Sequence, residues 1–164
     1  MFRKYNGETM KGLALKKMRS YCNYQPRTHR DVKEKLYTLG LWKKDVEELL
    51  SQLIEMGYVN EELFARSYAE ERFKIQKWGK RKIQSQLKQR DVSEYNIEHV
   101  LKSIDETLYT ENLNKHARKK WDSVKGIGAN LFAKMRKTGN FLLQKGYESQ
   151  LVWQALEKLK KGEI

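Results

Sequence analysis

One pattern of spacing occurs three times in this chain of 164 residues. Each copy starts at a leucine (Leu36, Leu87 or Leu142), and the starts lie 51 and 55 residues apart. Apolar or turn-forming residues follow at offsets of four, five, ten, thirteen, fourteen and seventeen in all three copies. Apolar residues three and four apart share one face of a helix. The pattern therefore predicts a helix, a tight turn and a second helix, laid down three times.

A further helical stretch precedes each copy, at about 8–24, 60–77 and 106–124. The sequence thus predicts an all-α protein of about nine helices, built from three tandem three-helix units at 7–58, 59–105 and 106–162. Thr28 and Asp31 have the spacing of a capping box, which marks a helix start. Units of about fifty residues bury little surface alone, so we expect neighbouring units to stack into an elongated protein.

Composition limits the class of protein. Aromatic residues make up 11% of the chain, more than disordered chains contain. No apolar run exceeds three residues, so no membrane contact is predicted, and the first residues lack the apolar stretch of a secretory signal. The single cysteine, Cys22, excludes an internal disulfide and fits a reducing compartment. We expect a cytoplasmic protein, and a monomer because no heptad seam is present.

Charge is segregated along the chain. With 34 Lys and Arg against 21 Asp and Glu, the formal net charge is +13. Residues 72–90 hold eight basic side chains and no acidic one, and residues 114–137 hold eight basic side chains and only Asp122 as an acid. Such blocks create local fields that attract a polyanion or an acidic protein surface. The candidate contact residues in these blocks are Arg72, Lys74, Lys77, Lys80, Arg81, Lys82, Lys88, Arg90, Lys115, Arg118, Lys119 and Lys120.

Two local features have both an ordinary and a functional interpretation. Trp78 and Trp121 lie in or beside the basic blocks, where an aromatic ring can stack on a base, although aromatics at helix ends are more often core residues. Gly126-Ile127-Gly128 is similar to the turn of helix-hairpin-helix modules, whose backbone N–H groups bind a DNA phosphate. A plain connection between two helices is the favoured interpretation of that segment.

Catalytic chemistry is not predicted. The three histidines are far apart, and none has metal-ligand spacing with Cys22, which is expected to be a buried helix residue. No G-x-x-x-x-G-K-[ST] phosphate-binding loop is present. We therefore predict a protein that is not an enzyme and that uses no cofactor and no metal.

The repeat and the basic blocks together resemble the RecX family of recombination regulators. The resemblance spans about 13–160 and is strongest in the middle unit, where Asn60 leads a helix with F-A-x-x-Y at Phe64–Tyr68, followed by G-x-x-x-I-x-x-x-L at Gly79–Leu87. Further matching residues lie at 27–36, at Gly40-Leu41 and at Gly146-Tyr147. The chain has Glu61 where the family commonly has aspartate, and Asp91 where a turn glycine is frequent. Aspartate accepts a left-handed backbone less readily than glycine, so the geometry of the second turn is the feature to check.

The resemblance implies an all-helical, non-enzymatic protein that binds the RecA recombinase, docks along its nucleoprotein filament, and inhibits ATP hydrolysis and strand exchange in DNA repair, recombination and the SOS response. It implies the RecA filament as the main partner, with single- and double-stranded DNA as secondary, non-specific ones. A free-standing, non-sequence-specific DNA-binding helical module is the alternative, and a helical-repeat scaffold for proteins is a third. Acidic residues after each of the first two turns, such as Glu47, Glu48, Glu94 and Glu98, disfavour insertion of those helices into a DNA groove.

Overall fold

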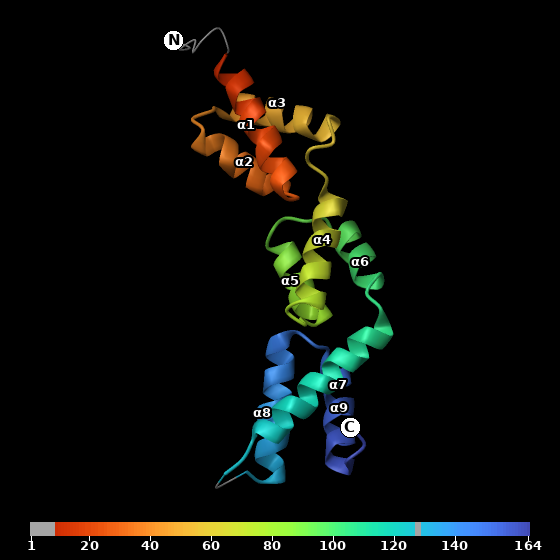
Figure 1. Ribbon diagram of the computed structural model, residues 1–164. Helices are drawn as coiled ribbons and strands as arrows, with labels where there is room; N and C mark the ends of the chain where they lie inside the picture. The colour runs from red at the N-terminus through yellow and green to blue at the C-terminus, as the bar shows by residue number, and fades with distance from the viewer. Residues whose placement is uncertain (1–8, 127–128) are drawn as a thin grey trace. The chain divides into compact units, whose positions relative to one another are not determined.

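The computed structural model describes residues 9–126 and 129–164 (Figure 1). Within these ranges the chain forms nine α-helices and no strand, which confirms the all-α prediction. None of the described helices is both long and apolar enough to cross a membrane. The helices are α1 Met10–Tyr24, α2 His29–Thr38, α3 Lys43–Glu55, α4 Glu61–Lys74, α5 Lys80–Lys88, α6 Glu94–Lys102, α7 Glu106–Ser123, α8 Leu131–Lys145 and α9 Ser149–Lys161.

The chain divides into two compact units. The first combines the described residues up to 67 with 88–96, and the second combines 68–87 with the described residues of 97–164. Helices α4 and α6 begin in the first unit and end in the second. The division into three units at 7–58, 59–105 and 106–162 stays a prediction.

Helices α1, α2 and α3 pack against one another around an apolar core in the first unit. Met18, Leu36 and Leu53 are fully buried there. Helix α2 starts at the predicted capping box: the Thr28 hydroxyl accepts a hydrogen bond from the Asp31 N–H, and the Asp31 carboxylate accepts one from the Thr28 N–H, both at 3.0 Å. These two bonds satisfy N–H groups that have no partner within the helix, and so fix where α2 begins.

Helices α7, α8 and α9 pack against one another in the second unit. Tyr109 on α7 and Tyr147 after α8 are fully buried, with their ring centroids 5.3 Å apart. The side chains of Asp105 and Asn130 cap α7 and α8 by accepting a backbone N–H at 2.8 Å in each case. Both caps use short polar side chains, as helix starts commonly do.

The predicted repeat is visible in burial and in backbone geometry. Every apolar position of the three copies is buried except Leu101, which is half-buried. The turn residues Gly40, Asp91 and Gly146 all have a left-handed backbone, with φ of 83°, 58° and 92°. In each turn the N–H of this residue donates to the carbonyl three residues earlier, at 2.9 to 3.0 Å. Asp91 therefore adopts the same turn conformation that glycine adopts in the other two copies, although a side chain makes it costly.

Candidate nucleic-acid interface

The twelve predicted contact residues do not all lie in one compact unit. Lys88 and Arg90 belong to the first compact unit, and the other ten belong to the second. Lys88 pairs with Glu94 at 3.1 Å, and Arg90 lies 4.0 Å from Asp31. The surface described below is therefore built from the second unit alone.

The start of α5 is joined to the end of α8. The Gly79 N–H donates to the Lys145 carbonyl at 2.8 Å, and the Arg81 N–H donates to the Gly146 carbonyl at 3.1 Å. The first N–H groups of one helix thus bind carbonyls at the end of another, so each helix end supplies the partners that the other lacks. The Tyr147 hydroxyl adds a bond to the Lys77 carbonyl at 3.1 Å. This joint brings the part of the first basic block at Lys77 to Arg81 against the C-terminal end of α8.

The positive charges of lysines from three parts of the sequence act on His116 of α7. The pKa of His116 is lowered first by burial, and then by the positive charges of Lys145, Lys119, Lys77 and Lys115. A neutral imidazole is therefore favoured near pH 7, because a further positive charge at this position is repelled. We call Lys77, Lys115, Lys119 and Lys145 with His116 the His116 surface. It combines Lys77 of the first basic block with Lys115 and Lys119 of the second.

Lys145 is the member of this surface that the sequence analysis missed. Its ammonium donates to the Gln76 carbonyl at 3.3 Å and lies 5.9 Å from the centroid of the Phe141 ring. His116 and Lys120 contact the same ring, at 6.2 and 5.5 Å. Lys145 stands outside the two basic blocks, but it occupies the repeat position directly before the turn, where the second copy has Arg90. Comparing the copies position by position would have found it.

Several predicted contact residues are already engaged within the chain. The Lys80 side chain is 18% exposed, pairs with Glu106 and lies 5.0 Å from the Tyr109 ring. Lys74 pairs with Glu70 at 3.4 Å, and Arg118 with Asp122 at 3.0 Å. These ion pairs reduce the charge available to a partner.

Six other predicted contact residues make no ion pair with any residue that the structure describes. They are Lys77, Arg81, Lys82, Lys115, Lys119 and Lys120. Arg81, Lys115 and Lys119 are exposed, and Lys82 is half-buried. The charges of the three exposed residues can meet an anionic partner.

Cationic side chains of the same protein lie near the rings of both candidate stacking tryptophans. The Trp78 ring has the Lys82 ammonium at 4.3 Å and the Arg72 guanidinium at 5.2 Å from its centroid. Trp121 is 9% exposed and has the Lys134 ammonium at 5.5 Å. Cations on a ring face compete with a base for that face. The core interpretation is therefore favoured for both residues.

The acidic side chains after the first turn are largely neutralised. Lys11 pairs with Asp45 at 2.9 Å and with Glu48 at 2.5 Å, and Lys33 pairs with Glu47 at 2.9 Å. After the second turn, Glu94 pairs with Lys88, and Glu98 with Lys102. The Glu98–Lys102 pair lies within α6, whereas the other pairs join neighbouring helices. None of these acids presents a cationic face to a DNA groove.

The described ranges contain no group of three His, Cys, Asp or Glu side chains that could hold a metal ion. Cys22 is 7% exposed as expected, and burial raises the pKa of its thiol, which disfavours the reactive thiolate. Of the Gly126-Ile127-Gly128 segment, Ile127 and Gly128 lie outside the described residues.

Comparison with known proteins matches the middle and last helices to two family models. One, described as the second three-helix domain of RecX, matches residues 60–101. The other, described as the third three-helix domain of RecX, matches residues 107–156. Together they cover more than half of the chain.

Individual relatives agree with this match. The regulatory protein RecX of Clostridium tetani is 34% identical over 149 residues, which are 91% of this chain and 66% of that protein. The regulatory protein RecX of Bacillus cytotoxicus is 27% identical over 158 residues, 96% of this chain and 57% of that protein. The chain therefore spans about two thirds or less of the length of these relatives.

A solved structure agrees in fold. The crystal structure of RecX from Lactobacillus salivarius superposes with a TM-score of 0.79 at 22% identity, covering 92% of this chain and 97% of that one. The two matched domain models and the relative from Clostridium tetani show that the chain belongs to the RecX family.

Proposed function

We propose that this chain is a non-enzymatic regulator that docks on the RecA–DNA filament through the His116 surface and inhibits its ATP hydrolysis and strand exchange. The observation that carries this proposal is the convergence of Lys77, Lys115, Lys119 and Lys145 around one histidine, in a member of the RecX family. Lysine ammonium groups bind phosphate as point charges, without reading sequence. DNA is then a secondary, non-specific partner, and the chain acts as a monomer.

The proposed contact is electrostatic and therefore salt-sensitive. Each phosphate neutralised on single-stranded DNA releases counterions, and contributes about 0.7 to the slope of log affinity against log salt. We expect co-sedimentation of the chain with RecA filaments on single-stranded DNA to weaken markedly between about 50 and 200 mM salt. Filament ATPase measured in parallel should fall as the bound chain increases.

The decisive variant reverses three exposed or half-buried lysines at once: Lys77→Glu, Lys115→Glu and Lys119→Glu. Joint substitution of Lys80, Arg81 and Lys82 is a poorer choice, because Lys80 is paired and mostly buried. The variant should bind filaments at least about tenfold more weakly, and its salt slope should fall by about 2, which is three phosphate contacts at about 0.7 each. The inhibition of ATP hydrolysis should weaken in proportion.

A matched control is Lys16→Glu, Lys17→Glu and Lys44→Glu in the first compact unit. These residues are exposed, and the total charge changes equally. The control should keep most of the affinity. Equal losses in both variants, or a wild-type chain that neither binds filaments nor slows ATP hydrolysis at micromolar concentration, would contradict the proposal.

The alternative, a free-standing DNA-binding module, is favoured by the same lysine cluster. Affinity for bare DNA separates the two functions. A filament regulator binds RecA filaments more tightly than the DNA they contain, whereas a DNA-binding module binds both alike or binds bare DNA better. The His116 resonances provide a local readout, because a bound phosphate raises the pKa of the imidazole that four lysines now lower.

A further inference from the structure

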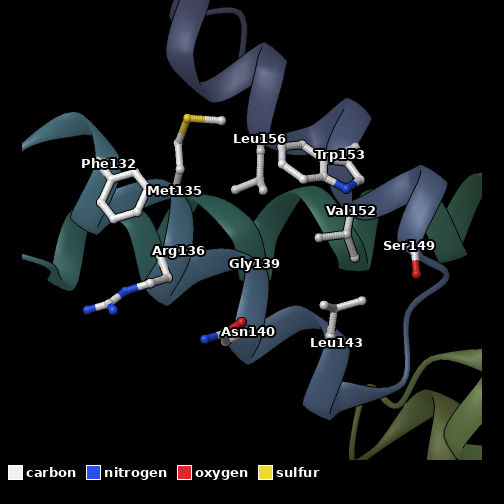
Figure 2. Close-up of a pocket in the computed structure, with 10 residues that line it drawn as sticks. All are labelled: Phe132, Met135, Arg136, Gly139, Asn140, Leu143, Ser149, Val152, Trp153 and Leu156. Atoms are coloured by element: carbon white, nitrogen blue, oxygen red, sulfur yellow. The ribbon is translucent and has the colours of Figure 1, made fainter.

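An apolar groove lies between α8 and α9 (Figure 2), and none of the lysines of the His116 surface lines it. Its volume is about 380 Å³. Figure 2 shows Met135 of α8 and Val152 and Leu156 of α9 pointing into the space between the two helices. Phe132 and Trp153 also line the groove, yet they are 72% and 60% exposed. Large apolar side chains grouped at an open groove are typical of a binding surface.

The charge around the groove indicates what fits it. Helix α8 carries four basic residues and no acidic one: Lys134, Arg136, Lys137 and Lys145. Arg136 lines the groove, is exposed, and has its guanidinium 5.9 Å from the Phe132 ring. Among the described residues it forms no ion pair. An occupant must therefore bring apolar side chains for the groove and a carboxylate for Arg136.

Two other occupants fit less well. A second copy of this chain would bring its own basic α8 to a symmetric contact, and each copy has a net charge of +13. Single-stranded nucleic acid would supply phosphate for Arg136, and its bases could stack on Phe132 and Trp153, but they would leave the inner groove unfilled. The inner groove is lined by Met135, Val152 and Leu156, which suit aliphatic side chains.

We propose that the α8–α9 groove binds an amphipathic, acidic helix of a partner protein. Apolar side chains spaced three and four residues apart on that helix would fill the groove, and a flanking carboxylate would pair with Arg136. Under the function proposed above, on which this step rests, the helix belongs to the recombinase. The His116 surface then meets the nucleic acid and the groove meets the protein.

The filament experiment uses the double variant Phe132→Ser and Trp153→Ser, which leaves net charge unchanged and alters only exposed side chains. It should bind RecA filaments at least about tenfold more weakly, the loss expected for truncating interface anchors. Its affinity for bare single-stranded DNA should not change. Trp42→Ser, at an 80% exposed residue of the first unit, is the control and should bind filaments normally. Unchanged filament affinity in the double variant, or an equal loss on bare DNA, would overturn the proposal.

A second measurement tests the groove without RecA. A fluorescein-labelled peptide of about five helical turns carries leucines along one face and glutamates elsewhere. Fluorescence anisotropy should show binding to the wild-type chain, and the double variant and Arg136→Glu should each weaken it at least about tenfold. A scrambled peptide of the same composition should not bind. Equal binding of both peptides overturns the groove proposal, whereas a wild-type chain that binds the striped peptide but not filaments contradicts only the proposed function.

Discussion

Gly79 and Gly146 meet backbone to backbone. A Cβ atom on Gly79 would lie 2.2 Å from both the carbonyl carbon and the carbonyl oxygen of Gly146. Neither atom can move without breaking the hydrogen bonds that join α5 to α8. The joint therefore depends on a glycine that the family-like G-x-x-x-I-x-x-x-L motif supplies.

Gly79→Ala should destabilise the protein by about 1–3 kcal/mol or more, the cost of overpacking a tight contact. The loss should appear as a lower urea midpoint for the second compact unit. Gly12→Ala is the matched control, because the Cβ there meets only the Thr9 hydroxyl at 3.5 Å. This exposed helix position should gain about 0.5–1 kcal/mol. Equal changes in unfolding free energy for the two variants would contradict the close approach of the Gly79 and Gly146 backbones.

Asp91→Gly should stabilise the protein. Asp91 has a φ of 58°, and a side chain in the left-handed region costs of order 1 kcal/mol that glycine does not. The ion pair lost with it, to Arg30 at 3.8 Å, is exposed and contributes little. Thermal unfolding should show a higher midpoint for Asp91→Gly and a lower one for Asp91→Ala. A lower midpoint for the glycine variant would show that the Asp91 side chain holds the turn.

Tyr109→Phe should cost more than Tyr147→Phe. The Tyr109 hydroxyl donates to the Glu148 carboxylate at 2.6 Å and accepts a hydrogen bond from the Lys80 N–H at 2.8 Å. Removing the hydroxyl leaves both of these groups without that hydrogen-bond partner. That loss is about 1–3 kcal/mol, against about 0.5–1.5 kcal/mol for the one bond from Tyr147 to the Lys77 carbonyl. Urea unfolding at pH 7 ranks the two variants. The reverse order would contradict the network.

Alkaline pH should weaken the fold through Tyr147. Burial, and then the Glu148 charge, raise the pKa of Tyr147 to about 12, above its ordinary value of 10.0. The folded state thus keeps this proton when the unfolded state releases it, so the stabilisation is complete below pH 10 and is lost as pH rises from 10 to 12. The slope is about 1.4 kcal/mol per pH unit for one group.

Unfolding free energies at pH 8, 10 and 11 measure this slope. Tyr147→Phe is the control, because lysine titration contributes equally to both proteins and the difference between them isolates the tyrosine. If the unfolding free energy of wild type and variant fell equally with pH, the pKa of Tyr147 would not be raised by folding.

Much of the fold follows from periodicity, since buried positions recur at fixed offsets and the turn residues share one backbone conformation. The capping box at Thr28 and Asp31 follows from local sequence for the same reason. The interface follows less well. Charge runs located Lys115 and Lys119, but they could not separate these from Lys80, because its partner Glu106 comes from another helix. Lys145 joins the cluster through the packing of α8 on α7 and through the α5–α8 joint. Both are contacts between distant parts of the sequence, and in the joint Gly79 and Lys145 are 66 residues apart.

That joint also sets an order of events during synthesis. The Gly79 and Arg81 N–H groups find their acceptors at Lys145 and Gly146, near the carboxyl end of this sequence. While the ribosome is still making α8, the Gly79 and Arg81 N–H groups lack these two acceptors. The lysines around His116 are thus brought together only after α8 has been made, when the helices of the first unit have already emerged.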